Sequence, residues 1–347
     1  MYILFFAPNY LPHIGGVEKH ISFVSNELIK DGHNVTIITV KSNKEYDDFE
    51  SNGLITIFRI RRTIHLFNSV KMVYFILCNY KIVRRANILH FHDFSTFWNW
   101  GLPLFPFLKI SGKKLYLTFH GWEGHIPPKK INVIKRQICT FLVNGNITVG
   151  HFIEKWYKTK ASIINYGGVE RVVYEKQKTK KKIVFVGRLE SDTGILLYLK
   201  AWEIFLQEHP EYQFDIYGDG RLRFEIEDII NERKISSTAV KGFIENPASC
   251  YQDAEIIFTS GYLGILEAFY CKIPVITVYD NSLKEDYLRL MPGSSNMMWI
   301  ENSVAGILNA MKEALVDNEK VSVAFDFAEK NSWGKIKDDY YKLWNVA

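Results

Sequence analysis

Residues 2–40, YILFFAPNYLPHIGGVEKHISFVSNELIKDGHNVTIITV, contain an apolar run, a loop with two glycines, an amphipathic segment and a second apolar run. Four apolar residues of the amphipathic segment share one helical face: Val17, Ile21, Val24 and Leu28. The segment ends at Gly32, as helices often do, and the second apolar run follows. Strand, helix and strand in this order predict a βαβ unit.

The same alternation continues along the whole chain. ITIFRI, ILHFH, KLYLTF and NITVG predict further strands of a largely parallel sheet that helices cover on both faces. The lysine-rich stretch VYEKQKTKKK (residues 173–182) interrupts the pattern and predicts a solvated linker. KIVFVG, YQFDIYG, TAVKG, EIIFTS and IPVITV then predict a second sheet of the same kind. We therefore expect an α/β protein of two Rossmann-like domains that face each other across a cleft.

Composition limits the class of protein. A chain of 347 residues with 47% hydrophobic and 23% charged residues can bury the cores of two domains. Its net charge of +5 is too dilute to indicate a nucleic-acid-binding protein. The four cysteines stand far apart, which favours neither a zinc knuckle nor a disulfide framework. The N-terminus lacks the features of a signal peptide, and we expect a cytoplasmic protein.

The loops of the second half carry the groups expected to bind an anionic ligand. Arg188 directly follows a strand and is placed to contact a diphosphate. A flexible turn at residues 217–220 follows the next strand. Further along, Glu267 projects from the first turns of a helix and could accept the two hydroxyls of a ribose. The amides of residues 264–266 could meet phosphate oxygens, although Glu267 could equally be an ordinary charge near a helix N-terminus.

The first half offers a glycine pair and a group of acidic and histidine side chains. Gly15 and Gly16 open a helix, where bare amides could hold a phosphate, although a glycine pair is more often just a turn. Six residues follow two neighbouring strands: His90, His92, Asp93, His120, Glu123 and His125. Their spacing matches no familiar zinc pattern, so a metal site competes with acid-base or orienting roles for His120 and Asp93. Ordinary residues at strand ends remain the third interpretation.

Seven motifs in this order resemble the family 4 glycosyltransferases, retaining enzymes of the GT-B architecture. The first half carries APNYLPHIGGVEKH and DGHNVTIIT, and INYGGVE at residues 164–170 is similar to the passage into the donor domain. The second half carries VFVGRLESDTG, DIYGDGRLR, VKGF and GILEAFYCKIPVI. The resemblance spans nearly the whole chain and implies domains at residues 1–170 (acceptor) and 171–330 (nucleotide sugar). It also implies that the helix at 331–347 crosses back to the first domain.

The resemblance implies a retaining, metal-independent transfer from a nucleotide-diphosphate sugar to a glycan, polysaccharide or lipid-linked acceptor. His120 would lie beside the reacting sugar, Arg188 would neutralise the diphosphate, and Glu267 would hold the ribose, as the catalytic residues. Donor contacts would come from Gly15, Gly16, Gly187, Arg188, Thr193, Gly218, Gly242, Phe243, Gly264, Ile265, Leu266 and Glu267. Gly242 and Phe243 would lie against the nucleobase. No metal, no resident cofactor and no nucleic-acid partner is expected.

Two positions depart from the family pattern. Thr193 stands where the family usually has a lysine, and Thr259 stands where it usually has a glutamate eight residues before Glu267. A missing second charged contact to phosphate costs roughly one to two decades of affinity unless another group replaces it. Lys272, Arg221 and Arg223 are the candidate replacements. The departures keep a rival open, a non-catalytic relative that binds a sugar nucleotide or a partner enzyme.

A peripheral contact with a membrane is a further hypothesis. Residues 59–85 place arginines at both ends of an aromatic and aliphatic stretch, which could lie on an anionic lipid surface near a lipid-linked acceptor. PPKKINVIKRQ at residues 127–137 is the second candidate. A core helix with solvated basic ends explains the first stretch equally well.

Overall fold

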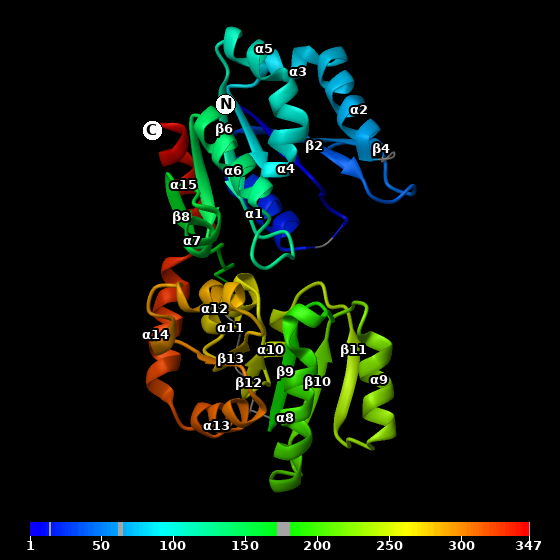
Figure 1. The fold of residues 1–347 in the computed structure, drawn as a ribbon, viewed down its shortest axis with the longest axis vertical. Helices are drawn as coiled ribbons and strands as arrows, with labels where there is room; N and C mark the ends of the chain where they lie inside the picture. Colours follow the sequence, from blue (N-terminus) through cyan, green and yellow to red (C-terminus); the bar gives the residue numbers. More distant parts are fainter. Residues whose placement is uncertain (14, 62–64, 172–180, 347) are drawn as a thin grey trace. The chain divides into compact units, whose positions relative to one another are not determined.

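The computed structural model describes residues 1–13, 15–61, 65–171 and 181–346, and it divides into two compact units. The first unit comprises Met1–Gly167 and Trp333–Ala347, and the second comprises Gly168–Ser332. Each unit is a sheet covered by helices (Figure 1). Most of the expected linker lies at residues 173–180, outside the described residues.

The described part of the first unit contains an eight-stranded sheet with the order β3-β4-β2-β1-β5-β6-β7-β8. All neighbours pair in parallel except the edge strand β3, which is antiparallel to β4. The strands are β1 (Tyr2–Ala7), β2 (Asn34–Lys41), β3 (Phe49–Ser51), β4 (Ile55–Arg61), β5 (Ile88–His92), β6 (Lys114–Phe119), β7 (Gly145–Val149) and β8 (Ile163–Asn165). The carboxyl ends of the parallel strands therefore share one edge.

Helices cover both faces of this sheet, because right-handed crossovers place the helix after β1 and the helices after β4 on opposite faces. Helix α15 packs against α1 and thus joins the first of these faces. The helices are α1 (Gly16–Lys30), α2 (His65–Cys78), α3 (Tyr80–Arg85), α4 (Phe94–Thr96), η1 (Phe97–Gly101), η2 (Leu102–Leu104), α5 (Phe105–Ile110), α6 (Lys130–Leu142), α7 (Phe152–Tyr157) and α15 (Trp333–Trp344).

The described part of the second unit contains a six-stranded parallel sheet with the order β11-β10-β9-β12-β13-β14. The strands are β9 (Lys182–Val186), β10 (Gln213–Tyr217), β11 (Thr238–Gly242), β12 (Ile256–Phe258), β13 (Val275–Val278) and β14 (Trp299–Glu301). The strand order reverses between β9 and β12, and ligands of open parallel sheets bind at such a switch point.

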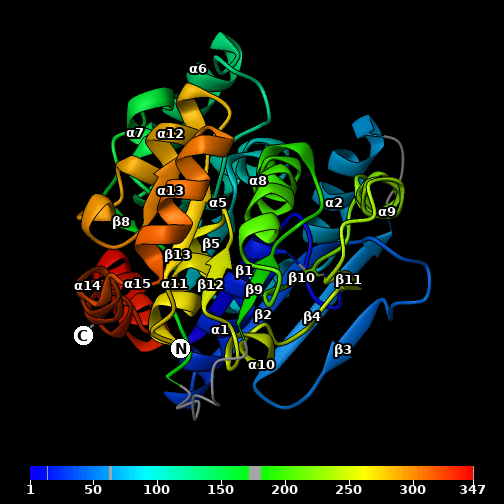
Figure 2. The same ribbon diagram turned by 90° about the horizontal axis from the view of Figure 1, so that it is seen from below.

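Helices α8 and α13 lie side by side on one face of this sheet (Figure 2), and α11 packs against α14. The helices are η3 (Ser191–Thr193), α8 (Ile195–Glu208), α9 (Arg223–Glu232), α10 (Ala248–Tyr251), α11 (Tyr262–Tyr270), α12 (Ser282–Arg289), η4 (Ser294–Asn296), α13 (Val304–Ala314) and α14 (Asn318–Lys330). The short helix η3 and helix α8 follow β9, and α11 follows β12.

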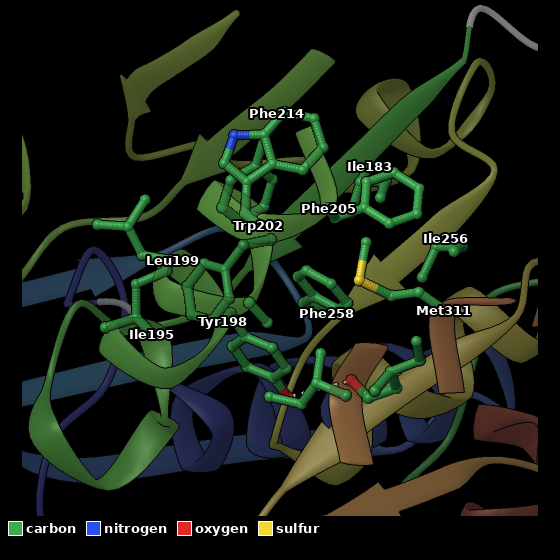
Figure 3. Close-up of a cluster of buried hydrophobic side chains, with 14 of the residues drawn as sticks. Ile183, Ile195, Tyr198, Leu199, Trp202, Phe205, Phe214, Ile256, Phe258 and Met311 are labelled. Carbon is green, nitrogen blue, oxygen red and sulfur yellow. Dashed lines mark hydrogen bonds between the residues drawn. The ribbon is translucent and has the colours of Figure 1, made fainter. Parts of the chain in front are cut away.

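The α8 face of the second sheet has an aromatic core (Figure 3). The rings of Tyr198 and Phe258 stack with their centroids 4.4 Å apart, and the Tyr198 hydroxyl donates to the carbonyl oxygen of Ile276 at 3.0 Å. Trp202 is fully buried, and its indole Nε1 donates to Thr238 Oγ1 at 2.7 Å. These contacts hold α8 to the sheet and thereby fix the loop that precedes it.

The predicted α/β class and parallel sheets are confirmed, and each strand expected from an apolar run is present. Strands β3, β8 and β14 were not expected. Each has only three residues, but β12 is equally short and was predicted, so length alone does not explain why they were missed.

Replacing Trp202 with alanine should destabilise the second unit by about 3–5 kcal/mol, because the substitution leaves a large cavity and removes the hydrogen bond to Thr238 Oγ1. Denaturant unfolding followed by circular dichroism measures the effect. Ile204→Ala, on the same helix at 44% exposure, is the matched control. Equal losses for the two variants would contradict the assigned core.

Candidate functional site

Backbone hydrogen bonds join two loops at the carboxyl edge of the second sheet. The Gly187 amide donates to the Tyr217 carbonyl oxygen at 3.1 Å, and the Leu189 amide donates to the Asp219 carbonyl oxygen at 2.9 Å. A Cβ atom on Gly218 would lie 1.8 Å from the Gly187 carbonyl oxygen, so no other residue fits there. The loops after β9 and β10 are therefore one rigid unit, which we call the paired loops (residues 187–194 and 217–222).

The loop after β11 joins the same network. The Gly218 amide donates to the Gly242 carbonyl oxygen at 2.8 Å. Gly242 has φ +78°, a conformation that favours glycine, and Phe243 beyond it is 52% exposed. The sequence-predicted residues Gly187, Gly218 and Gly242 thus lie in one continuous backbone network, and their contact with a donor remains a prediction.

Arg188 extends from the paired loops into solvent. Its side chain is 68% exposed, and Nη2 donates to the carboxylate of Asp192 at 2.8 Å. An exposed ion pair of this kind contributes little stability, so it would not hold the guanidinium against a stronger anion. A planar guanidinium matches the oxygens of a diphosphate. Arg188 is one of two exposed cations on the paired loops; the other is Arg221, which is 89% exposed.

Thr193 does not act as a substitute for the missing lysine. It is buried, and its Oγ1 donates to the Glu190 carbonyl oxygen at 2.7 Å within η3. The next residue, Gly194, has φ +76°, and a Cβ atom there would lie 2.0 Å from Val278 Cγ2. The threonine hydroxyl thus stabilises the turn before α8.

The start of α11 only partly matches the expectation. The amide of Ile265 donates to the Gly261 carbonyl oxygen at 3.0 Å, inside the helix. Leu266 lies one residue further into the helix, and both side chains are fully buried. The predicted phosphate contacts of the Ile265 and Leu266 amides are therefore wrong, because only the first amides of a helix are free of the intrahelical ladder. The amide of Gly264 lies before the first hydrogen bond within the helix.

Thr259 fills space beside this helix. A Cβ atom on Gly264 would lie 2.6 Å from Thr259 Oγ1, so the two residues are in close contact. Glu267 is half-buried one turn later, and its charge raises the pKa of the buried Tyr251 in addition to the main effect of burial. The ribose contact predicted for Glu267 remains a prediction.

The three candidate replacement cations each contact another side chain, although the ion pair of Arg221 is as exposed as that of Arg188 and constrains it no more. Arg221 Nε lies 3.0 Å from the Glu190 carboxylate, and Arg223 Nε lies 3.1 Å from Glu227. Lys272 Nζ lies over the Phe325 ring, 4.2 Å from its centroid.

Lys284 on α12 is a cation that the sequence analysis missed. Its side chain is buried, and Nζ donates to the Ser260 carbonyl oxygen at 2.5 Å, directly before α11. Burial lowers the pKa of this ammonium group to about 8. A lysine in an amphipathic helix resembles any surface lysine, so no local signal reveals it.

The paired loops also border a pocket of about 430 Å³ in the second unit. The start of α8 and the ends of β13 and β14 supply its walls: Ser191, Asp192, Gly194, Leu196, Leu197, Lys200, Val278, Tyr279, Asp280 and Asn302.

In the first unit, the half-buried His120 directly follows β6 and forms a histidine cluster with the buried His20, His90 and His92. His120 Nε2 lies 3.0 Å from His92 Nδ1, and the rings of His120 and His20 meet edge to face at 4.9 Å. Burial lowers the pKa of His20 to about 3 and holds the pKa values of the other three well below 6.5. The cluster is therefore neutral in the folded protein at neutral pH.

Helix α15 completes this cluster. The Tyr340 hydroxyl lies 3.0 Å from His20 Nε2 and 3.2 Å from Thr118 Oγ1. The indole of Trp344 donates to His90 Nδ1 at 3.1 Å. Among the described residues, no group of three His, Cys, Asp or Glu side chains is arranged to hold a metal ion.

The loop after His120 is held by Arg136, a residue that sequence analysis did not single out. Arg136 is almost fully buried, and it donates to the Gly121 carbonyl oxygen and to the Glu123 carboxylate, each at 2.6 Å. The Tyr157 hydroxyl donates to the other oxygen of Glu123 at 2.6 Å. Glu123 is thus a structural ion-pair partner, and Arg136 fixes the backbone next to His120.

Gly15 and Gly16 begin α1 as expected, but a carboxylate lies beside them. A Cβ atom on Gly15 would lie 2.4 Å from Glu18 Oε2, and the other carboxylate oxygen lies 2.9 Å from His13 Nδ1. Glu18 is buried. A phosphate that approached these amides would meet this negative charge, so the contact predicted for Gly15 and Gly16 requires Glu18 to move.

The first membrane candidate, residues 59–85, is not one surface segment. Arg59 belongs to β4, is buried, and pairs with Glu50 at 2.9 Å, so its predicted place in a surface basic cluster is wrong. Arg62 lies outside the described residues. No helix in the described part of the chain has the length and apolar character needed to cross a bilayer.

The histidine cluster should make the first unit sensitive to acid. The unfolded chain binds protons near pH 6.5, whereas the folded cluster does not, so stability is lost as pH falls below about 6.5. We expect the melting temperature to fall between pH ~7 and ~5, and His20→Gln should reduce that fall. The exposed His125→Gln is the control. An unchanged pH dependence in His20→Gln would contradict the assignment.

Comparisons with known proteins identify glycosyltransferase families in both halves of the chain. A family model described as Glycosyltransferase Family 4 matches residues 14–163, and one described as Glycosyl transferases group 1 matches residues 169–321. Together these two matches include most of the chain.

One relative is an α-1,4-N-acetyl-D-galactosaminyltransferase of Campylobacter jejuni, named for the acceptor GalNAc-α-(1→4)-GalNAc-α-(1→3)-diNAcBac-PP-undecaprenol. It is 25% identical, over 95% of this chain and 94% of the relative. A poly(glycerol-phosphate) α-glucosyltransferase of Bacillus subtilis is 29% identical, over 48% of this chain and 26% of the relative. Sucrose-phosphate synthase from Thermosynechococcus elongatus has a similar fold, with a TM-score of 0.77, 15% identity, and coverage of 99% and 98%. The chain is therefore a glycosyltransferase of family 4, with a GT-B fold.

Proposed function

We propose that the second unit binds a nucleotide-diphosphate sugar and that the sugar is transferred, with retention of its configuration, to a lipid-linked glycan. The observation that carries the donor assignment is Arg188, an exposed guanidinium on rigid loops at the switch point of a parallel sheet. The family membership and the lipid diphosphate in the name of the Campylobacter relative support the acceptor class.

The proposed chemistry is stabilisation of the leaving group. When the bond between the sugar and the diphosphate breaks, negative charge builds up on the phosphate and positive character on the sugar ring. Arg188 would stabilise the phosphate, and the leaving phosphate oxygen would take the proton of the acceptor hydroxyl. No protein nucleophile is needed for this step.

The neutral state of His120 suits a contact with a sugar hydroxyl. Its partner His92 is fully buried and its Nε2 has no hydrogen-bond partner in the structure. An uncharged imidazole held in one orientation can donate or accept a hydrogen bond without attracting the diphosphate. We therefore assign His120 to hydroxyl recognition.

Removing the Arg188 guanidinium should weaken binding of a nucleoside diphosphate by about tenfold or more, because one charge-assisted contact is lost. Titration calorimetry with UDP, GDP and ADP against wild type and Arg188→Ala measures this loss. Transfer activity from the matching sugar donor should fall by a similar factor. Lys312→Met, which removes one positive charge from α13, should change neither quantity.

If no nucleoside diphosphate binds the wild-type protein, or if Arg188→Ala binds as well as wild type, the donor assignment is wrong.

Helix α6 supplies the surface that would bring the enzyme to a lipid-linked acceptor. Four exposed apolar residues follow one another at helical spacing: Ile131, Ile134, Ile138 and Phe141, which are 53%, 50%, 39% and 88% exposed. Lys130 and Lys135 flank this stripe, and α6 contains no acidic residue. An apolar stripe with cationic edges is complementary to an anionic lipid surface. We propose that α6, within the second membrane candidate, makes this contact.

The double variant Ile134→Glu and Phe141→Glu should no longer bind vesicles, because its two negative charges would enter the lipid interface. Flotation with phosphatidylglycerol vesicles, compared with phosphatidylcholine alone, measures binding. Phe224→Glu, at a residue 76% exposed on α9, is the matched control. The surface assignment fails if wild type ignores anionic vesicles or if the double variant floats with them equally well.

A further inference from the structure

The donor site proposed above lacks one of the two cations that family 4 enzymes usually place at the diphosphate. Thr193 stands at the position of the usual lysine and is buried in a turn. Lys272 and Arg223 contact other groups, and Arg221 is exposed and paired with Glu190. A diphosphate carries at least two negative charges, and Arg188 alone supplies one positive charge. Another cation in this region would neutralise the second negative charge of the diphosphate.

Lys284 reaches this region from α12. Its Nζ contacts the Ser260 carbonyl oxygen at 2.5 Å and lies 4.3 Å from the centroid of the Tyr287 ring. The Tyr287 hydroxyl accepts a hydrogen bond from the amide of Tyr262, the first residue of α11, at 2.8 Å. The Tyr262 and Tyr287 rings stack with centroids 3.9 Å apart. Lys284 is thus held firmly against the start of α11.

The charges around Lys284 leave the ammonium group under-compensated. The neighbouring charged groups are Arg188 and Asp192 from the loop after β9 and Asp280 from the loop after β13. Asp192 is already paired with Arg188, and Asp280 is exposed. Ser260 is the only hydrogen-bond acceptor that the described residues give to Nζ. Burying an ammonium group with so little compensation costs stability, which a purely structural lysine would have no reason to incur.

The contact between Tyr262 and Tyr287 explains why a charged side chain is needed to bind an anion at the start of α11. The amide of Tyr262 would otherwise be free at the helix start to meet a phosphate oxygen. Because the Tyr287 hydroxyl occupies it, that contact is lost to an incoming anion. A lysine placed one helical turn before Tyr287 can replace the lost contact with a charge.

We propose that Lys284 is the second cation that binds the donor diphosphate, in place of the lysine that family 4 enzymes usually have at the position of Thr193. The inference rests on the proposed donor site of the second unit. It assigns to α12 a direct contact with the leaving group, so that Arg188 and Lys284 share its charge.

Lys284→Met tests this role, because methionine keeps the length of the side chain and removes the charge. We expect nucleoside diphosphate affinity to fall by about tenfold or more, whereas the affinity for the nucleoside should stay unchanged. Lys284→Arg should keep most of the diphosphate affinity. Lys312→Met on α13 is the matched control. Unchanged diphosphate affinity in Lys284→Met would overturn the proposal.

The wild-type protein offers a test that does not depend on the folding of a variant. Affinity for a nucleoside diphosphate should fall as pH rises through about 8, where Lys284 loses its proton. Burial holds the pKa of the neighbouring Tyr287 phenol above its usual range, so the phenol does not contribute to this change. The decline should disappear in Lys284→Arg. A flat profile for the wild type, or the same decline in Lys284→Arg, would overturn the proposal.

The proposed function and this inference fail in different ways. If Arg188→Ala loses diphosphate affinity and Lys284→Met does not, only the role of Lys284 is wrong. If neither the wild type nor any variant binds a nucleoside diphosphate, the donor site itself is wrong.

Discussion

The close backbone contact between two loops of the second sheet is the constraint on which the site depends. Gly218 lies so near the Gly187 carbonyl oxygen that a Cβ atom would be 1.8 Å away, and amide-carbonyl bonds continue the contact on either side. These bonds leave Arg188 between them as a side chain that need not stabilise the fold. A cation on a rigid backbone requires little reorganisation when it meets an anion, which is how preorganised charges stabilise a leaving group.

The fold was largely predictable because the apolar runs of parallel strands are visible locally. Three short strands, β3, β8 and β14, were missed, although β12, which also has three residues, was predicted from its apolar run. The helix start within the site was predicted less accurately. In the structure α11 already begins at Tyr262. The Ile265 amide, which was expected to be free, therefore makes a hydrogen bond within the helix. An error of one turn in a helix start decides whether an amide can bind a ligand.

The candidate site was predictable where one loop supplies the chemistry and was not where distant segments combine. Arg188 follows directly from its place after a strand. Lys284 becomes relevant only because it contacts Ser260, 24 residues earlier in the chain. The role of Arg136 likewise depends on its hydrogen bonds to Glu123 and Gly121. Arg59 pairs with Glu50 and is buried, so it does not belong to the predicted surface cluster. Such contacts depend on tertiary packing, which a single sequence does not display.

The central claim is that the second unit recognises the diphosphate of its donor through cations on rigid loops and on α12. Titration calorimetry of one nucleotide series with no, one and two phosphates tests this claim most directly. We predict a gain of about tenfold or more in affinity from the monophosphate to the diphosphate, and a gain that shrinks as salt is added. Equal affinity for the monophosphate and the diphosphate at low salt would contradict it.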